Sequence, residues 1–191
     1  MRKNKWKISQ KKTLLLTCLL CLFVLCAAYS QPQGQAIFRV NEHNIKTSSD
    51  VKVAWLLPVY VSRVVDGDTI VVEIENPPAG FSRRERVRFL GVDAPETVRS
   101  SRPIEHFGRE SSDMAKATLQ ERQVYLAFDW NLRDRFGRLL AYIYLEDGVC
   151  FNAMQLKYGY TRVYVRFPFQ FLEEFRQYEA EARAKKLGLW E

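Results

Sequence analysis

Residues 64–97 read VVDGDTIVVEIENPPAGFSRRERVRFLGVDAPET, and this stretch predicts two strands that each carry an aspartate at one end. The apolar run Ile70–Val72 follows a turn that contains Asp68, and a second apolar run leads into Asp93. If the strands are neighbours in one sheet, the two carboxylates can meet, and no His or Cys lies near them in the sequence. An all-oxygen pair suits a hard divalent cation such as Ca²⁺ better than Zn²⁺.

The first 30 residues predict a secretory signal or a single membrane anchor. Six basic residues and no acidic residue lie in residues 1–12, and an apolar run from Leu14 to Ala28 follows. The run is short for the ~20 residues that a spanning helix needs, and small residues around Ser30 fit a signal peptidase site. Cleavage near Ser30 is therefore favoured over a retained anchor, which predicts a secreted, periplasmic or envelope-associated protein.

The charge of the remaining chain is almost balanced. After residue 30 there are 23 of the 29 basic residues and all 22 acidic ones, so the net charge of +7 says little about nucleic acid. Any attraction to phosphate must come from local arginine clusters, at residues 83–88 and 133–138. A solvated basic rim is the simpler interpretation of either cluster alone.

Cysteine usage excludes two further kinds of site in the same part of the chain. Cys150 is the only cysteine after residue 30, so neither an intramolecular disulfide nor a cysteine metal site can form there. Its apolar neighbours predict a buried, inert thiol. The two histidines, His43 and His106, have no partner pattern for a zinc site or a catalytic triad.

Residues 31–55 predict a partly disordered linker with one short strand at 36–40, and residues 56–191 predict the folded domain. Alternating apolar residues predict five strands, over residues 59–65, 70–75, 85–90, 124–128 and 139–145. Between the third and fourth strands a period near 3.6 predicts a helix over 107–121. Two more helices are predicted, over 149–158 and from Phe171 onward. This order suggests an α+β fold on a small barrel of the OB type.

Several segments of this domain resemble the staphylococcal nuclease, or thermonuclease, family. Val65–Thr69 resembles the metal-binding turn of that family, Arg88–Thr97 its catalytic strand, and Asp134–Tyr144 the segment that carries its second catalytic arginine. The helix start at Phe107–Glu110, Asn152 and the closing Lys186–Trp190 fit as well. The resemblance covers about residues 56–190, with the motifs in the right order, and implies a five-stranded OB-fold barrel with three helices.

The resemblance also implies a reaction and a cofactor. It implies hydrolysis of phosphodiester bonds in DNA and RNA with Ca²⁺, in which water attacks, the 5′ oxygen leaves and 3′-phosphate ends remain. Asp68 and Asp93 would hold the cation together with the main-chain carbonyl of Ala94, a position where the family often has threonine. The simpler interpretation of the two aspartates is a turn-forming residue and a cap.

Three further residues would take part in catalysis by the same resemblance. Arg88 and Arg138 would clamp the phosphate with guanidinium forks that a lysine cannot copy; the simpler interpretation is a surface ion pair. Glu96 would act as the general base or orient the attacking water. The alternative for Glu96 is a solvated carboxylate after Pro95.

The predicted substrate contacts depart from the family pattern. Arg135 and Phe136 stand where the family usually has a lysine and a tyrosine that reach a terminal phosphate of the bound nucleotide. Phe136 can stack but cannot donate a hydrogen bond, so recognition of that phosphate should be weaker. The two tyrosines that flank the base in the family fall near Tyr164 and Arg166, and Tyr164 is either a stacking residue or a core aromatic. The long loop at 76–84 either extends the groove or is a surface excursion.

A nucleic-acid-binding OB module without catalysis is the rival function. The shared presence of the five charged residues favours the enzyme, because a binding module has no need for this set: Asp68, Arg88, Asp93, Glu96 and Arg138. The partners implied are DNA and RNA, with single strands preferred. A monomer is expected, without a protein partner.

Overall fold

The computed structural model describes residues 56–97 and 105–191 of the 191-residue chain. The predicted signal or anchor at 1–30 and the predicted linker at 31–55, with its short strand, lie outside the described residues. Within the described ranges no helix has the length and apolar character needed to cross a membrane.

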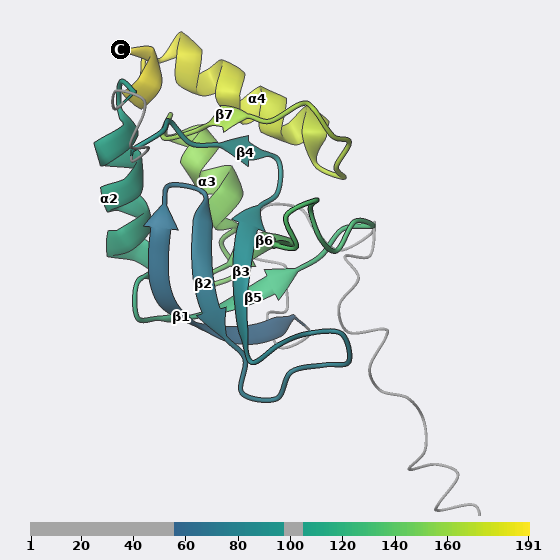
Figure 1. The fold of residues 1–191 in the computed structure, drawn as a ribbon. Helices are drawn as coiled ribbons and strands as arrows, with labels where there is room; N and C mark the ends of the chain where they lie inside the picture. Colours follow the sequence, from purple (N-terminus) through teal and green to yellow (C-terminus); the bar gives the residue numbers. More distant parts are fainter. Residues whose placement is uncertain (1–55, 98–104) are drawn as a thin grey trace, which may run out of the picture. The chain divides into compact units, whose positions relative to one another are not determined.

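Five strands close into a barrel in the order β1-β2-β3-β6-β5 (Figure 1). Their bounds are β1 Leu57–Asp66, β2 Thr69–Glu73, β3 Arg84–Phe89, β5 Gln123–Ala127 and β6 Leu139–Tyr144. All neighbouring strands are antiparallel except β3 and β6, which are parallel. The predicted five-stranded OB barrel with helices is confirmed.

The alternation along β3 explains why this strand serves both the core and the surface. Glu85, Val87 and Phe89 are buried, whereas Arg84 and Arg86 are exposed and Arg88 is half-buried, as the period of two in a strand requires. The inner side chains meet a barrel core of fully buried aliphatic residues: Val61, Ile70, Val72, Val87, Leu126, Leu139 and Ala141. The arginines of β3 are therefore left on the outer face of the barrel.

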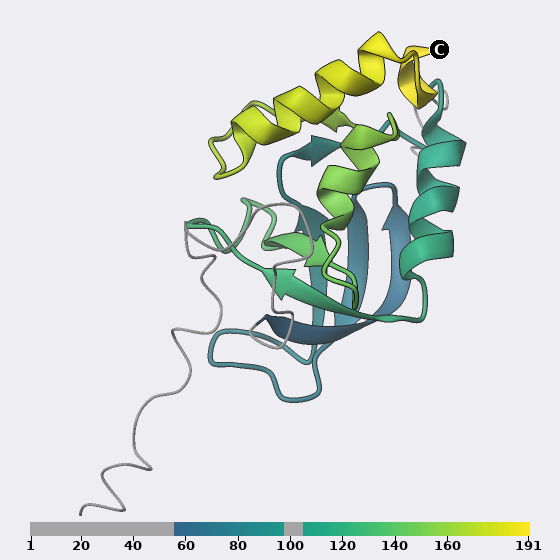
Figure 2. The same cartoon turned by 180° about the vertical axis from the view of Figure 1, so that it is seen from behind.

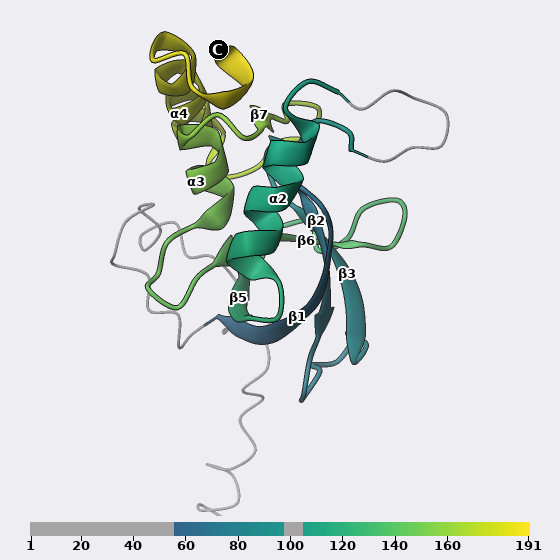
Figure 3. The ribbon, with the colours of Figure 1, turned by 90° about the vertical axis from the view of Figure 1, so that its left-hand side faces the viewer.

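The described residues form three α-helices, as predicted, of which two pack on the barrel and the third packs on the second. α2 (Gly108–Leu119) packs beside β1 (Figure 3), and α3 (Phe151–Lys157) lies between β6 and α4 (Leu172–Ala184) (Figure 2). A 3₁₀ turn, η2 (Gly188–Trp190), follows α4 and packs against it. α3 starts two residues later than predicted, because Val149 and Cys150 still pair with the end of β6: the Leu145 N–H donates to the Val149 carbonyl at 3.0 Å, and Cys150 forms a β-bridge with Tyr144.

Two strands of two residues each were not predicted. β4 (Val92–Asp93) and β7 (Arg162–Val163) pair antiparallel in a separate small sheet. Elements this short show no alternation in a sequence. They matter because β7 brings the segment after it beside the end of β3, where the Tyr164 N–H donates to the Gly91 carbonyl at 3.0 Å.

Gly91 makes the sharp turn from β3 into β4. Its φ is +73°, in the left-handed region that favours glycine. A Cβ here would also lie 2.6 Å from the Phe169 ring. The buried Asn152 holds the same corner, because its side-chain amide donates to the Leu90 carbonyl and accepts from the Ile143 N–H, both at 2.9 Å. The strand that leads to Asp93 is thereby fixed against β6 and α3.

Candidate functional site

One pocket of about 680 Å³ opens where β2 begins and β3 ends. Nine of the residues that line it are the nine that the sequence analysis singled out for catalysis, cation binding or substrate binding: Asp68, Arg88, Asp93, Ala94, Glu96, Arg135, Phe136, Arg138 and Tyr164. They come from five separate segments of the chain, so the fold gathers them.

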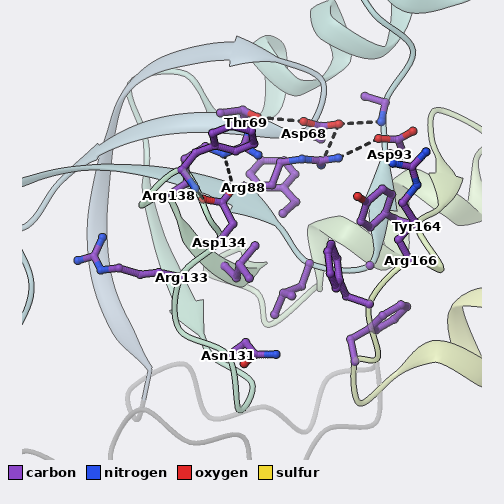
Figure 4. A pocket seen from close by; sticks show the side chains of 18 of the residues that line it. Asp68, Thr69, Arg88, Asp93, Asn131, Arg133, Asp134, Arg138, Tyr164 and Arg166 are labelled. Atoms are coloured by element: carbon purple, nitrogen blue, oxygen red, sulfur yellow. Dashed lines mark hydrogen bonds and ion pairs between the residues drawn. The ribbon is translucent and has the colours of Figure 1, made fainter.

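Arg88 lies between the two aspartates (Figure 4). Its Nη1 is 2.8 Å from Asp68 Oδ2, and its Nη2 is 2.9 Å from Asp93 Oδ1. Nη1 also donates to the Val92 carbonyl at 2.9 Å. The register of the sheet sets this up, because Thr69 in β2 pairs with Arg88 in β3 and so places Asp68 next to the arginine. The two carboxylates therefore contact the same guanidinium, which lies between them.

Asp68 is buried and held by further hydrogen bonds. Its Oδ2 accepts from the Ala94 N–H at 2.8 Å, and its Oδ1 accepts from the Thr69 hydroxyl at 2.9 Å. Burial raises the pKa of Asp68 to about 7, although the neighbouring Arg88 acts in the opposite direction. Asp68 is therefore part of a fixed charge arrangement rather than a plain turn residue.

The turn that carries Asp68 packs tightly against two helices. The Gly67 carbonyl accepts from Gln155 Nε2 of α3 at 2.6 Å. A Cβ at Gly67 would collide with the Ser111 hydroxyl of α2 and lie 2.7 Å from the Ala94 Cβ. The sequence did not predict this contact of Gln155. A polar glutamine among the apolar residues of a short helix was the feature that could have indicated a buried hydrogen bond.

Arg138 lies on the other side of the pocket, held by a carboxylate of its own. Its Nε donates to Asp134 Oδ2 at 2.7 Å, and Asp134 Oδ1 accepts from the N–H groups of Phe136 and Arg138 at 2.9 Å each. Burial alone would raise the pKa of Asp134, but these hydrogen bonds from Arg138 and Phe136 hold it below its ordinary value. The sequence did not predict a role for Asp134. Its position four residues before Arg138 was the feature that could have indicated an ion pair.

The neighbouring Arg133 points away from the carboxylates in Figure 4. It forms two hydrogen bonds with Glu85, at 2.8 and 3.0 Å, and donates to the Gly80 carbonyl at 2.9 Å. It thereby ties down the loop at 76–84, none of whose residues lines the pocket. This loop is a surface excursion rather than an extension of the groove. Within the arginine cluster at 133–138, Arg133 bonds Glu85 whereas Arg138 bonds Asp134.

Arg135 and Phe136 form an exposed pair at the pocket rim. The Arg135 guanidinium lies 4.7 Å from the centre of the Phe136 ring, and the Arg138 guanidinium lies 5.7 Å from it. The Phe136 side chain is 69% exposed. An aromatic ring this open, with cations on it, can receive a base or a sugar but offers no hydrogen-bond donor of its own.

Tyr164 stands on the opposite side, where β7 ends. It is half-buried, and its ring centre lies 5.8 Å from the Arg88 guanidinium and 6.1 Å from the Phe167 ring. Tyr164 lines the pocket and does not belong to the hydrophobic core cluster, which favours the stacking role over the core alternative. Arg166, the second position considered there, lines it too.

Glu96 lies at the pocket edge just after β4 and is half-buried. Its carbonyl accepts from the Glu105 N–H at 3.0 Å, and Gly108 at the start of α2 packs against that carbonyl. The Glu96 carbonyl is therefore held against the start of α2.

Cys150 has no place in the pocket. It is buried and free, and burial raises the pKa of its thiol to about 12. The predicted buried thiol is confirmed, and the raised pKa makes the thiolate nucleophile inaccessible at neutral pH.

In the described ranges no three His, Cys, Asp or Glu side chains come together as a metal-binding group. Asp68 and Asp93 supply a pair of carboxylates only. A cation bound there would need main-chain carbonyl, water or substrate oxygens to complete its coordination, which is usual for hard cations.

Comparison with known proteins places the chain among nucleases. Residues 86–191 match the family described as Staphylococcal nuclease homologue. A thermonuclease of Staphylococcus intermedius is 37% identical over 149 residues, which cover 76% of this chain and 82% of that protein. The endonuclease YncB of Bacillus subtilis is 38% identical over 164 residues, covering 84% and 74%, respectively. A thermonuclease of Staphylococcus hyicus is 35% identical over 131 residues, covering 68% and 73%.

Proposed function

The chain belongs to the staphylococcal nuclease family, and we propose that it is a Ca²⁺-dependent nuclease acting on DNA and RNA. Water attacks the phosphorus, the 5′ oxygen leaves, and a 3′-phosphate end remains. The observation that carries the proposal is the gathering of nine residues around one pocket, with Arg88 in contact with both aspartates. A binding module has no use for such a set of opposed charges.

The carboxylate side of the pocket fits a hard cation. Asp68 and Asp93 both reach a single positive group, the Arg88 guanidinium, so their oxygens face the same small volume. The donors are all oxygen, as Ca²⁺ prefers, and the Ala94 carbonyl is the main-chain candidate. A bound cation supplies Lewis-acid polarisation of the phosphate and lowers the pKa of a bound water.

Arg88 and Arg138 stabilise the charge that develops on the phosphate oxygens. Each guanidinium is held in place by a carboxylate, so little reorganisation is needed when the charge develops. Each also keeps N–H groups beyond those the carboxylates take, because a guanidinium has five. Two such forks on opposite sides of the pocket can hold a tetrahedral phosphate group in one orientation.

Glu96 accepts the proton of the attacking water. A carboxylate within reach of that water raises its nucleophilicity as the bond to phosphorus forms. The 5′ oxygen that leaves takes up a proton from solvent, which balances the reaction. The hydrogen bond from the Glu105 N–H and the packing of Gly108 hold the Glu96 carbonyl, which supports a defined position for this residue.

Arg135, Phe136 and Tyr164 bind the nucleotide around the scissile bond. Stacking on Tyr164 requires an unpaired base, which favours single-stranded substrate. The N-terminal segment directs the protein to the cell envelope or beyond it, where free nucleic acid is the available substrate.

The first experiment is hydrolysis of single-stranded DNA by the full-length chain, with Ca²⁺ and then with a chelator. Glu96→Gln and Arg138→Ala are assayed beside the wild type, with circular dichroism as the folding control. The proposal predicts chelator-sensitive cleavage, 3′-phosphate ends, and a fall of about 10²–10³-fold in kcat for Arg138→Ala. DNA binding without any cleavage would instead establish the rival binding module.

A further inference from the structure

Two exposed aromatic side chains that line the pocket have no role in the scheme above. Trp130 is 60% exposed and Phe167 is 65% exposed, and both line the pocket. Asn131, next to Trp130 in the chain, lies at the opposite end of Figure 4 from Asp68. Exposed aromatic side chains on the wall of a pocket are typical of surfaces that bind a ligand.

Asp129 fixes the two segments that carry these rings to one another. Its Oδ1 accepts from the Trp130 N–H at 2.9 Å, and its Oδ2 accepts from the Gln170 N–H at 2.8 Å. The buried Tyr142 hydroxyl donates to the same oxygen at 3.1 Å. The loop after β5 and the segment before α4 are therefore joined through one half-buried carboxylate.

The Phe167 backbone is restricted as well. Pro168 follows it and confines the preceding residue to extended conformations, and the buried Phe169 packs against the Gly91 turn. The Phe167 ring lies 6.1 Å from Tyr164, tilted by 44°. The Tyr164 ring therefore lies close to both the Arg88 guanidinium, at 5.8 Å, and the Phe167 ring, at 6.1 Å.

We propose that Trp130 and Phe167 form a second base-stacking site, the far platform, which binds an unpaired base beyond the nucleotide held at Tyr164. The proposal rests on the proposed function and extends it from one nucleotide to a longer single strand. Stacking tolerates every base, so the far platform adds affinity without sequence preference. The exposed Arg166 lines the same pocket and can neutralise a phosphate between the two stacked bases.

A nucleic acid fits these rings better than a lipid surface does. The rings belong to the wall of the pocket that holds the carboxylates and the arginines, whereas a membrane contact needs an outward patch. The arginines around them are interleaved with aromatic residues, which is the pattern of single-strand binding grooves: Arg135, Phe136, Tyr164, Arg166 and Phe167.

The test measures binding and cleavage of oligonucleotides by the full-length chain. The variants are Trp130→Ala, Trp130→Phe and Phe167→Ala, with Tyr158→Ala as the matched control, since Tyr158 is 52% exposed and does not line the pocket. Each is measured with a thymidine dinucleotide and with longer thymidine oligonucleotides in which one base at a time is replaced by an abasic residue. Equilibrium binding with a chelator present measures the contribution of the far platform to oligonucleotide affinity without cleavage.

The wild type is expected to bind the longer oligonucleotide more tightly, with a loss at one abasic position away from the scissile linkage. Trp130→Ala should lose about tenfold more affinity for the longer oligonucleotide than for the dinucleotide, and should no longer respond to that abasic position. Trp130→Phe should recover most of the loss, and Tyr158→Ala should match the wild type.

Equal losses on both lengths, or an unchanged abasic profile in Trp130→Ala, would overturn the far platform. Loss of binding to anionic phospholipid vesicles with unaltered oligonucleotide affinity would assign the two rings to a membrane instead. A wild type that loses affinity at that abasic position but never cleaves would refute the proposed enzyme, whereas the far platform would be supported.

Discussion

The two ends of the pocket differ in how much the protein itself restrains their side chains. At one end Asp68 is buried, and the Arg88 side chain is 13% exposed and contacts two carboxylates. At the other end Trp130, Phe136 and Phe167 are each at least 60% exposed. A fixed, partly desolvated charge array suits bond breaking, whereas open rings suit strands of any sequence. Changes at the first end should therefore lower turnover, and changes at the second should weaken binding.

Arg138→Lys gives the largest expected effect. The lysine keeps the positive charge but loses the fork, so it cannot both bond Asp134 and hold the phosphate. We expect kcat to fall by about 10²–10³-fold with the melting temperature nearly unchanged. Steady-state hydrolysis and thermal melts measure this, with Arg83→Lys as the control, since Arg83 is exposed and outside the pocket. Near-normal turnover in Arg138→Lys would refute the phosphate role.

Asp134→Asn should have the next largest effect, through the position of Arg138 rather than through substrate contact. The amide can still accept the backbone N–H bonds but loses the charge that orients the guanidinium. We expect about a tenfold fall in kcat with little change in KM.

A double variant tests that assignment of Asp134. If Asp134 acts only through Arg138, adding Asp134→Asn to Arg138→Ala should cause no further loss, because the two act as a unit. Additive losses would mean that Asp134 contributes on its own. Asp134→Glu should recover part of the activity, which a merely structural loss would not allow.

The barrel and the charged end of the pocket could be predicted from the sequence because both depend on local patterns. The alternation of apolar and polar residues predicts which face of each strand is buried. Asp68 lies at a strand end, and the pairing of Thr69 with Arg88 brings it to the arginine that also contacts Asp93. The helix over 107–121 was visible from its period, although its true bounds are Gly108–Leu119.

The remaining features depend on contacts between distant segments. Gln155 reaches Gly67 across 88 positions of the chain, and Asp129 reaches the Gln170 backbone across 41. Trp130 falls between two predicted strands, and only the closed fold brings it to the pocket that Phe167 also lines. β4 and β7 were too short to leave a pattern, yet they position Asp93 beside Arg162.

Glu85→Gln tests the ion pair between Glu85 and Arg133, which takes no part in the proposed catalysis. The hydrogen bonds from Arg133 lower the pKa of Glu85. A carboxyl whose pKa is lowered by folding stabilises the protein above its unfolded-state pKa of about 4.3, and this stability disappears as the pH falls through the folded-state pKa. We expect the variant to lose about 1–2 kcal/mol of unfolding free energy at pH 7, with kcat unchanged.

Urea denaturation of both proteins between neutral and acid pH measures the Glu85 effect. The difference between wild type and variant should shrink below about pH 4, where the carboxyl of the unfolded chain becomes protonated, and should vanish below the lowered folded-state pKa. A difference that persists in acid would mean that Glu85 acts through packing rather than through its charge. A parallel fall in kcat would connect the 76–84 loop to the site after all.

Phe136→Tyr gives the smallest expected effect and is the one change expected to improve binding. The ring is 69% exposed with two guanidinium groups near its face, so a hydroxyl can be added without displacing a neighbour. The tyrosine hydroxyl can donate a hydrogen bond to a terminal phosphate, which phenylalanine cannot do. One such hydrogen bond should raise affinity by about three- to tenfold. Oligonucleotides with and without a terminal phosphate separate the effect from stacking, because only the phosphorylated one should gain. Equal gains on both would mean that the hydroxyl meets the base or the sugar, and the open end of the pocket would then bind nucleotides without reading their ends.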